Sequence, residues 1–92
     1  MQVVWTEPAL DEIDSVYTYF AEFNLQAAMN VAVALRAAGD SLETFPHRGR
    51  PVSGTAMREL IAPYRFLIRY RVTGDTVVIL RVRHASRRPT QP

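Results

Sequence analysis

The residues with the clearest chemical potential in this sequence are arginines, and they are concentrated in its second half. Ten of the eleven arginines lie within residues 47–92, and the chain contains no lysine. The planar guanidinium of arginine suits bidentate contacts with phosphate or carboxylate groups. The composition therefore indicates a surface that meets an anionic ligand or partner.

The charges divide the chain into an acidic half and a basic half. Residues 1–46 hold seven acidic residues against Arg36 alone, a net charge of −6. Residues 47–92 hold ten arginines against Glu59 and Asp75, a net charge of +8. Because a patch of one sign attracts the opposite sign, the second half is expected to bind an anionic partner.

Three other residues could take part in acid–base chemistry: His84, His47 and Glu59. A histidine side chain exchanges protons near neutral pH, as a general acid or base must. His84 ends an expected strand, however, where a histidine can also serve to bond the backbone. Glu59 could act as a base or neutralise nearby arginines, and His47 lies in an expected loop. No group of His, Asp and Glu has convincing metal-site spacing, and no cofactor is expected.

Length and composition indicate a single domain spanning residues 1–92. The hydrophobic content of 48% and charged content of 22% are typical of a folded globular protein. No apolar run approaches the roughly 20 residues that span a bilayer, and the first ten residues lack the basic start of a secretory signal. Together with the absence of cysteine, these features predict a cytoplasmic protein without disulfides or membrane contact.

The first half predicts a short strand followed by a helical hairpin. Residues 3–5 form a β-type run, and Thr6 is placed to cap a first helix. Asn24 caps a second helix, whose apolar stripe extends to Phe45 until Pro46 ends it. The short break between the helices makes them antiparallel.

Beyond a loop at 46–56, the pattern changes to the alternation of strands at 57–62, 64–72 and 77–83. A three-residue turn at 74–76 is expected, because it matches apolar with apolar residues across the last two strands. The resulting pairs are Val72–Val78, Tyr70–Leu80 and Ile68–Val82. The same register sets Leu67 opposite Arg83 and Arg69 opposite Arg81, and the latter pair is repulsive. Glu59, a bound anion or an acidic partner would have to compensate for it.

The expected fold is α+β, with an N-terminal strand and a helical hairpin packed on one face of a small, mainly antiparallel β-sheet. The other face is exposed and carries arginines that are expected to bind an anion or a partner. They are Arg65, Arg69, Arg71, Arg81 and Arg83, and Arg87 and Arg88 extend the set. Residues 84–92 contain two prolines and few apolar side chains, which predicts a short flexible tail.

Five segments, in this order, resemble the RelE/ParE toxin superfamily, the toxin half of bacterial type II toxin–antitoxin pairs. They are residues 4–10, 45–51, 58–60, 70–72 and 78–84. The resemblance covers nearly the whole chain. It implies two helices packed on an antiparallel sheet, and a cognate antitoxin that forms a hetero-oligomer with the toxin.

The superfamily has two main activities, and the resemblance favours the ParE-like one, inhibition of DNA gyrase. RelE-like members cleave mRNA on the ribosome with two basic residues on the second sheet strand, an arginine before the Tyr-x-Val segment, a later arginine and a terminal tyrosine. Arg58 and Arg87 match that set, Leu60 and Leu67 do not, and no tyrosine follows. If the chain is a nuclease, its candidate residues are Arg58, Arg65, His84 and Arg87.

RNA cleavage also needs groups that activate the 2′-hydroxyl and protonate the leaving oxygen. Only His84, Glu59 and His47 remain for those roles. The sequence therefore favours a toxin that acts on gyrase and is not itself an enzyme. A ribosome-dependent endoribonuclease is the first alternative, and a non-toxic basic module with salt-dependent nucleic-acid binding is the second.

Overall fold

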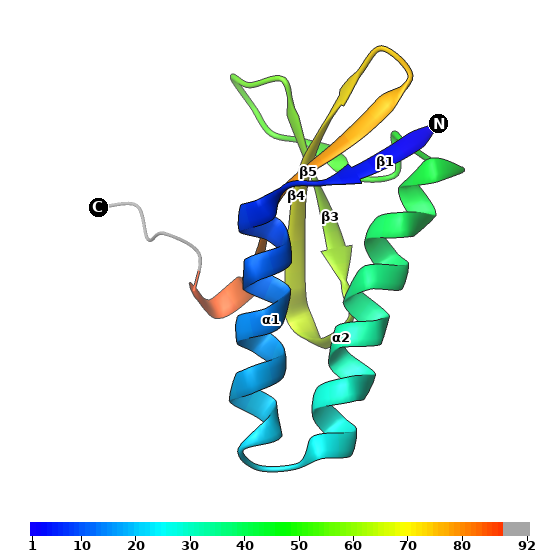
Figure 1. Cartoon of the computed structure of the whole chain (residues 1–92). Helices are drawn as coiled ribbons and strands as arrows, with labels where there is room; N and C mark the ends of the chain where they lie inside the picture. Colours follow the sequence, from blue (N-terminus) through cyan, green and yellow to red (C-terminus); the bar gives the residue numbers. More distant parts are fainter. Residues whose placement is uncertain (88–92) are drawn as a thin grey trace.

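The protein is described by a computed structural model that covers the backbone of residues 1–87 and the side chains of residues 1–86. The main elements are β1 (Gln2–Trp5), α1 (Glu7–Ala21), α2 (Leu25–Asp40), β2 (Arg50–Pro51), β3 (Met57–Ala62), β4 (Phe66–Thr73) and β5 (Thr76–His84). Three 3-10 turns are η1 (Ser41–Glu43), η2 (Pro63–Arg65) and η3 (Ala85–Arg87). The expected α+β fold is confirmed (Figure 1).

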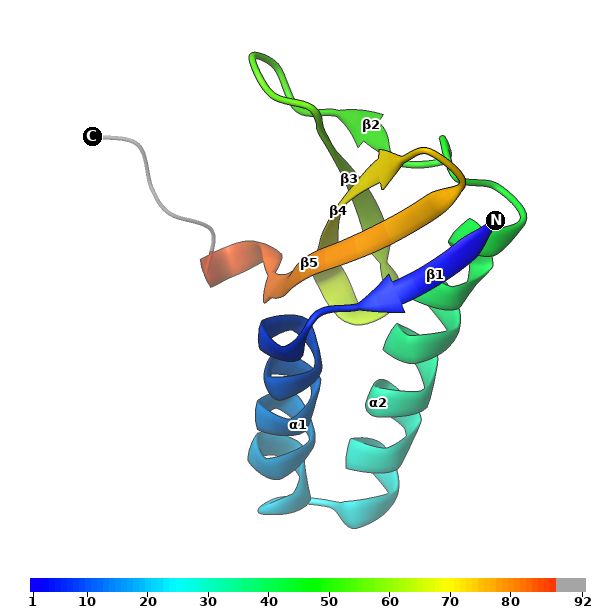
Figure 2. The ribbon, with the colours of Figure 1, turned by 45° about the horizontal axis from the view of Figure 1, so that its top comes forward.

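The sheet has the strand order β1-β5-β4-β3-β2. β1 runs parallel to β5, and the other neighbours are antiparallel. The two helices lie side by side and project beyond the strands as a hairpin (Figures 1 and 2). Within the described part of the chain, neither helix has the length and apolar character needed to cross a bilayer.

Both helices begin at the caps that the sequence predicts. Thr6 Oγ1 accepts a hydrogen bond from the backbone N of Ala9 at 3.4 Å, and Asn24 Oδ1 accepts one from the backbone N of Ala27 at 2.9 Å. The second helix ends earlier than expected. Ser41 Oγ donates to the carbonyl of Ala38 at 2.6 Å, a local bond of the kind that competes with the helix, and the chain continues into η1.

The core lies between the helices and the sheet. Its largest fully buried side chains are Tyr70, Leu35, Leu42, Ile68, Ile79 and Val77. Trp5 closes one side of it, packed so tightly on α2 that a Cβ on Gly39 would collide with the indole ring. The indole Nε1 also donates to Asp40 Oδ1 at 2.9 Å, and this bond ties β1 to the end of α2.

In the β4–β5 hairpin, the expected register is wrong next to the turn, where Val72–Val78 and Tyr70–Leu80 do not pair, and correct farther from it. The turn has two residues rather than three, and Gly74 adopts the positive φ of 61° that suits such a turn. The pairs next to it are Thr73–Thr76, Val72–Val77, Arg71–Val78 and Tyr70–Ile79. Leu80 is then the extra residue of a β-bulge, beyond which the expected pairs Ile68–Val82, Leu67–Arg83 and Arg69–Arg81 are confirmed. The bulge turns Val77 and Ile79 into the core while Arg81 stays outside.

Three smaller expectations also change. The expected loop contains the two-residue strand β2, which pairs with β3. Tyr64 and Arg65 have φ values of 60° and 64°, so β4 begins only at Phe66 and Arg65 lies in a turn rather than on the sheet face. Pro63 explains part of this break, because it lacks the N–H that a strand ladder needs. Residues 84–87 complete β5 and η3 instead of starting a flexible tail, and the remainder lies outside the described residues.

Candidate functional site

Four charged side chains form a row across the sheet, on the face away from the helices. The strand pairs that build it are Arg50–Glu59, Glu59–Arg69 and Arg69–Arg81. Glu59 is only 5% exposed and forms ion pairs with Arg69 at 3.0 Å and Arg50 at 3.5 Å. Glu59 therefore neutralises neighbouring arginines, which was one of the two roles considered for it.

Arg81, the second arginine of the repulsive pair, is neutralised by a carboxylate on helix α1. Glu12 Oε2, on α1, accepts hydrogen bonds from Arg81 Nε at 3.0 Å and Nη2 at 2.7 Å. These bonds raise the pKa of Arg81 above its ordinary value. Glu12 Oε1 accepts a third bond from the backbone N of Val82 at 2.7 Å. The sequence analysis missed Glu12, because no local pattern relates α1 to a strand 70 positions later.

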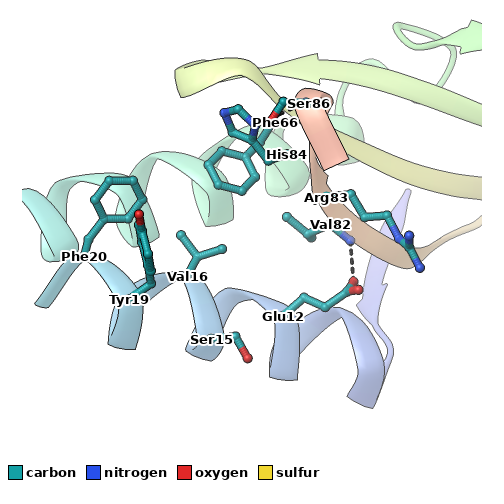
Figure 3. Close-up of a pocket in the computed structure, with 10 residues that line it drawn as sticks. All are labelled: Glu12, Ser15, Val16, Tyr19, Phe20, Phe66, Val82, Arg83, His84 and Ser86. Atoms are coloured by element: carbon teal, nitrogen blue, oxygen red, sulfur yellow. Dashed lines mark hydrogen bonds between the residues drawn. The ribbon is translucent and has the colours of Figure 1, made fainter. Parts of the chain in front are cut away.

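An open groove with a volume of about 620 Å³ lies between α1 and the end of β5 (Figure 3). Its apolar lining includes Val16, Phe20, Phe66 and Val82. Its ionisable groups include Glu12, Arg83 and His84. The groove thus combines an apolar surface with charges of both signs.

His84 is the sequence candidate that the structure places in this groove. Its Nδ1 accepts from the backbone N of Ser86 at 3.2 Å and lies 2.6 Å from Ser86 Oγ. Because the backbone N–H can only donate, this contact fits the tautomer that carries its proton on Nε2. The ring also packs edge-to-face on Phe66. Ser86 was not anticipated, and its position two residues after His84 is the only sequence signal for it.

Arg58, another nuclease candidate, supports a loop. Its Nη1 donates to the carbonyls of Gly49 at 2.7 Å and His47 at 3.3 Å. The same loop is held by the buried hydroxyl of Tyr70, which donates to the carbonyl of Pro46 at 2.8 Å and accepts from the N of Gly49 at 2.8 Å. A Cβ on Gly49 would lie 2.7 Å from the Tyr70 ring, so this close approach needs glycine.

The remaining arginines of the predicted set are only partly gathered. Arg71 is exposed on β4 and Arg83 is half-buried beside the groove. Arg65 is exposed in η2, off the strand face. The side chain of Arg87 and the whole of Arg88 lie outside the described residues. Within residues 1–86, no group of three or more His, Asp and Glu side chains is arranged to hold a metal ion.

The helical hairpin exposes five large apolar side chains. They are Tyr19, Phe23, Leu25, Met29 and Val33. Tyr19 and Phe23 make edge-type ring contact near the tip, with centroids 5.5 Å apart. Their spacing resembles that of core residues, which is why periodicity alone does not separate them from the buried stripe.

Comparison with known proteins identifies the family. Residues 3–89 match the family model of the ParE toxin of the type II toxin–antitoxin system parDE. Toxin RelE2 of Caulobacter vibrioides is 42% identical over 86 residues, which cover 94% of this chain and 97% of that toxin. Toxin RelE1 of the same bacterium is 34% identical over 76 residues, covering 79% and 81% respectively.

Solved structures are similar in fold. The chromosomal ParDE toxin–antitoxin system of P. aeruginosa contains a chain that matches with a TM-score of 0.82 and 23% identity, covering 91% of this chain and 95% of that one. The conserved hypothetical protein HP0894 from Helicobacter pylori matches with a TM-score of 0.57 and 17% identity, covering 94% and 96%. Because the family model spans nearly the whole chain, the chain belongs to the ParE toxin family of type II toxin–antitoxin systems, within a superfamily that also includes its RelE-named relatives.

Proposed function

We propose that this toxin inhibits DNA gyrase in the cytoplasm and that a cognate antitoxin neutralises it. The observation that carries the proposal concerns the positions at which a RelE-type nuclease has basic side chains. In this chain, the side chains at three of those positions support the fold instead. Leu60 and Leu67 occupy two of those positions and are buried, at 4% and 7% exposure. Arg58 occupies a third, and its guanidinium is bonded to loop carbonyls.

The acid–base groups of the groove argue in the same direction. RNA cleavage through the 2′-hydroxyl needs one group to accept a proton and another to donate one. In the described groove, the carboxylate of Glu12 is bound to Arg81 and Val82, and His84 Nδ1 is bound to Ser86. Among the imidazole and carboxylate groups of this groove, only His84 Nε2 therefore remains open for proton transfer. One atom cannot act as base and acid in the same step.

The exposed arginines support an acidic antitoxin. Arg65 and Arg71 are exposed, and carboxylates from a partner would form charge-assisted hydrogen bonds with them. Arg50, Arg69 and Arg81 already pair with Glu59 or Glu12, so an antitoxin carboxylate has to displace one of those acids to reach them. The antitoxin's carboxylates can therefore reach Arg65 and Arg71 directly, and Arg81 only by displacing Glu12.

A ribosome-dependent endoribonuclease is the second candidate. Two observations favour it: the sequence relatives carry RelE names, and His84 lies in a groove beside Arg83. An arginine there could stabilise the charge of a phosphorane during RNA cleavage. This candidate requires Nε2 of His84 to be essential.

Expression of the chain without antitoxin in bacterial cells separates the two candidates. Plasmid supercoiling and the integrity of translated mRNA are scored in the same culture. The gyrase proposal predicts relaxed plasmid, filamentous cells and intact messages. Cuts within the codons of translated messages, with normal supercoiling, would establish the nuclease instead.

A further inference from the structure

The second half of strand β5 forms an edge that no other strand covers in the described structure. β1 pairs with β5 only from Thr76 to Ile79, whereas β5 continues to His84. In the uncovered part, the backbone N of Val82 donates to the side chain of Glu12 instead of to a strand. Glu12 thereby caps an edge donor that would otherwise be open to an incoming strand.

The two oxygens of Glu12 reproduce the contacts of an added acidic strand. Oε1 takes the place of a strand carbonyl at Val82 N, at 2.7 Å. Oε2 takes the place of an acidic side chain at Arg81, at 2.7 Å from Nη2 and 3.0 Å from Nε. An extended peptide that carries a carboxylate can supply both groups, because its backbone carbonyls pair with the edge and its side chain reaches the guanidinium.

The groove beside this edge has a suitable surface for such a peptide. Val16, Phe20 and Phe66 give it an apolar floor, and Arg83 adds a second cation near Glu12 (Figure 3). Alternate side chains of a strand point in opposite directions. One set can therefore enter the groove while the other set presents carboxylates to the two arginines.

We propose that Glu12 is an internal competitor for the antitoxin: an extended, carboxylate-bearing segment of the antitoxin displaces it, pairs with the β5 edge at Val82 and takes over Arg81. This inference rests on the antitoxin partnership of the proposed function and not on gyrase as the target. The positive charge of Arg81 and Arg83 selects an acidic segment over a neutral or basic one. Removing the competitor should therefore strengthen antitoxin binding.

The test compares Glu12→Ala and Glu12→Gln with the matched controls Asp11→Asn and Asp14→Asn, which remove exposed acids from the same helix. The probe is the full-length cognate antitoxin, titrated against each purified toxin. Both Glu12 variants should lower the dissociation constant about three- to tenfold, since they remove charge-assisted bonds that the antitoxin must break. The controls should stay within about twofold, because an exposed acid contributes only weak long-range repulsion.

Amide hydrogen exchange at Val82 tests displacement directly. In the free toxin, Glu12→Ala should speed exchange at Val82, whereas in the antitoxin complex Val82 should be as protected in the variant as in the unmodified chain. Equal affinity of all four variants would overturn the proposal, and so would fast exchange at Val82 in the variant complex. Neither readout involves gyrase, so a failure here is distinct from a failure of the proposed target. Glu12→Gln keeps the side-chain volume and provides the measurement if Glu12→Ala does not fold.

Discussion

Arg69 and Arg81 lie directly opposite each other on β4 and β5, and each is paired with a different carboxylate. Glu59 from β3 lies 3.0 Å from Arg69, and Glu12 from α1 lies 2.7 Å from Arg81. Like charges that face each other across a sheet repel. The row of charged side chains therefore needs no bound partner to be stable, because two acids from different elements neutralise Arg69 and Arg81.

Replacing Glu59 by Gln should destabilise the fold. The substitution leaves Arg69 without its buried partner and restores the repulsion with Arg81. We expect a loss of about 1–3 kcal/mol in the free energy of unfolding, measured by denaturant titration. Glu43→Gln, which changes an exposed acid, should shift stability by less than about 0.5 kcal/mol. Equal stability of the two variants would show that Glu59 is not needed to neutralise the row.

The single hydroxyl group of Tyr70 should contribute measurably to the stability of the fold. Tyr70→Phe leaves the N of Gly49 and the carbonyl of Pro46 without the partner that each has now. The expected cost is about 1–3 kcal/mol, or a fall of roughly 4–8 °C in Tm for each kcal/mol in a domain of this size. Tyr64→Phe, at an exposed turn position, is the control and should leave Tm unchanged. A Tyr70→Phe protein as stable as this control would contradict the loop-holding role.

These two predictions also show which interactions a sequence can indicate. Glu59 was identifiable as a neutralising acid because the strand pattern placed it beside the arginines. The helix starts at Thr6 and Asn24 were predictable too, since capping depends on a few neighbouring residues. Local chemistry and alternation therefore determined much of the fold.

Features that depend on long-range packing were not predictable. The bulge at Leu80 allows a two-residue turn and still puts Ile68 opposite Val82, an outcome that strict alternation cannot represent. The left-handed turn at Tyr64 and Arg65 removed one arginine from the predicted face. Glu12 reached the site only through the packing of α1 against β5. The sequence therefore predicted the positive charge of the candidate site correctly, but it included Arg65 wrongly and omitted Glu12.

Under the proposed gyrase mode, His84→Ala should leave inhibition nearly unchanged. The histidine bonds Ser86 and packs on Phe66, so its removal affects local structure more than chemistry. Inhibition by the purified variant should stay within about threefold of that of the unmodified chain, whereas loss of a general acid or base costs about 10²–10⁴-fold in rate. Circular dichroism checks that the variant is folded. A loss of toxicity of that larger size in a folded variant would favour the nuclease.

Truncation after Ser86 tests the C-terminal residues. The deletion removes Arg87 and Arg88 together with two prolines and few apolar side chains, so Tm should fall only slightly. Toxicity should weaken clearly, because two cations of the predicted arginine set are lost. Replacing both arginines by alanine in the full chain separates lost charge from lost length. Unfolding on truncation, or full toxicity without these residues, would contradict the prediction.

The central claim, a toxin that blocks gyrase without cutting RNA, is tested most directly by a supercoiling assay with purified components. Gyrase, relaxed plasmid and ATP are incubated with increasing amounts of the antitoxin-free chain, and the supercoiled product is quantified on a gel. The account predicts dose-dependent loss of supercoiling, which returns when antitoxin is added in excess. Full gyrase activity at saturating toxin, from a preparation that still arrests cell growth, would contradict it.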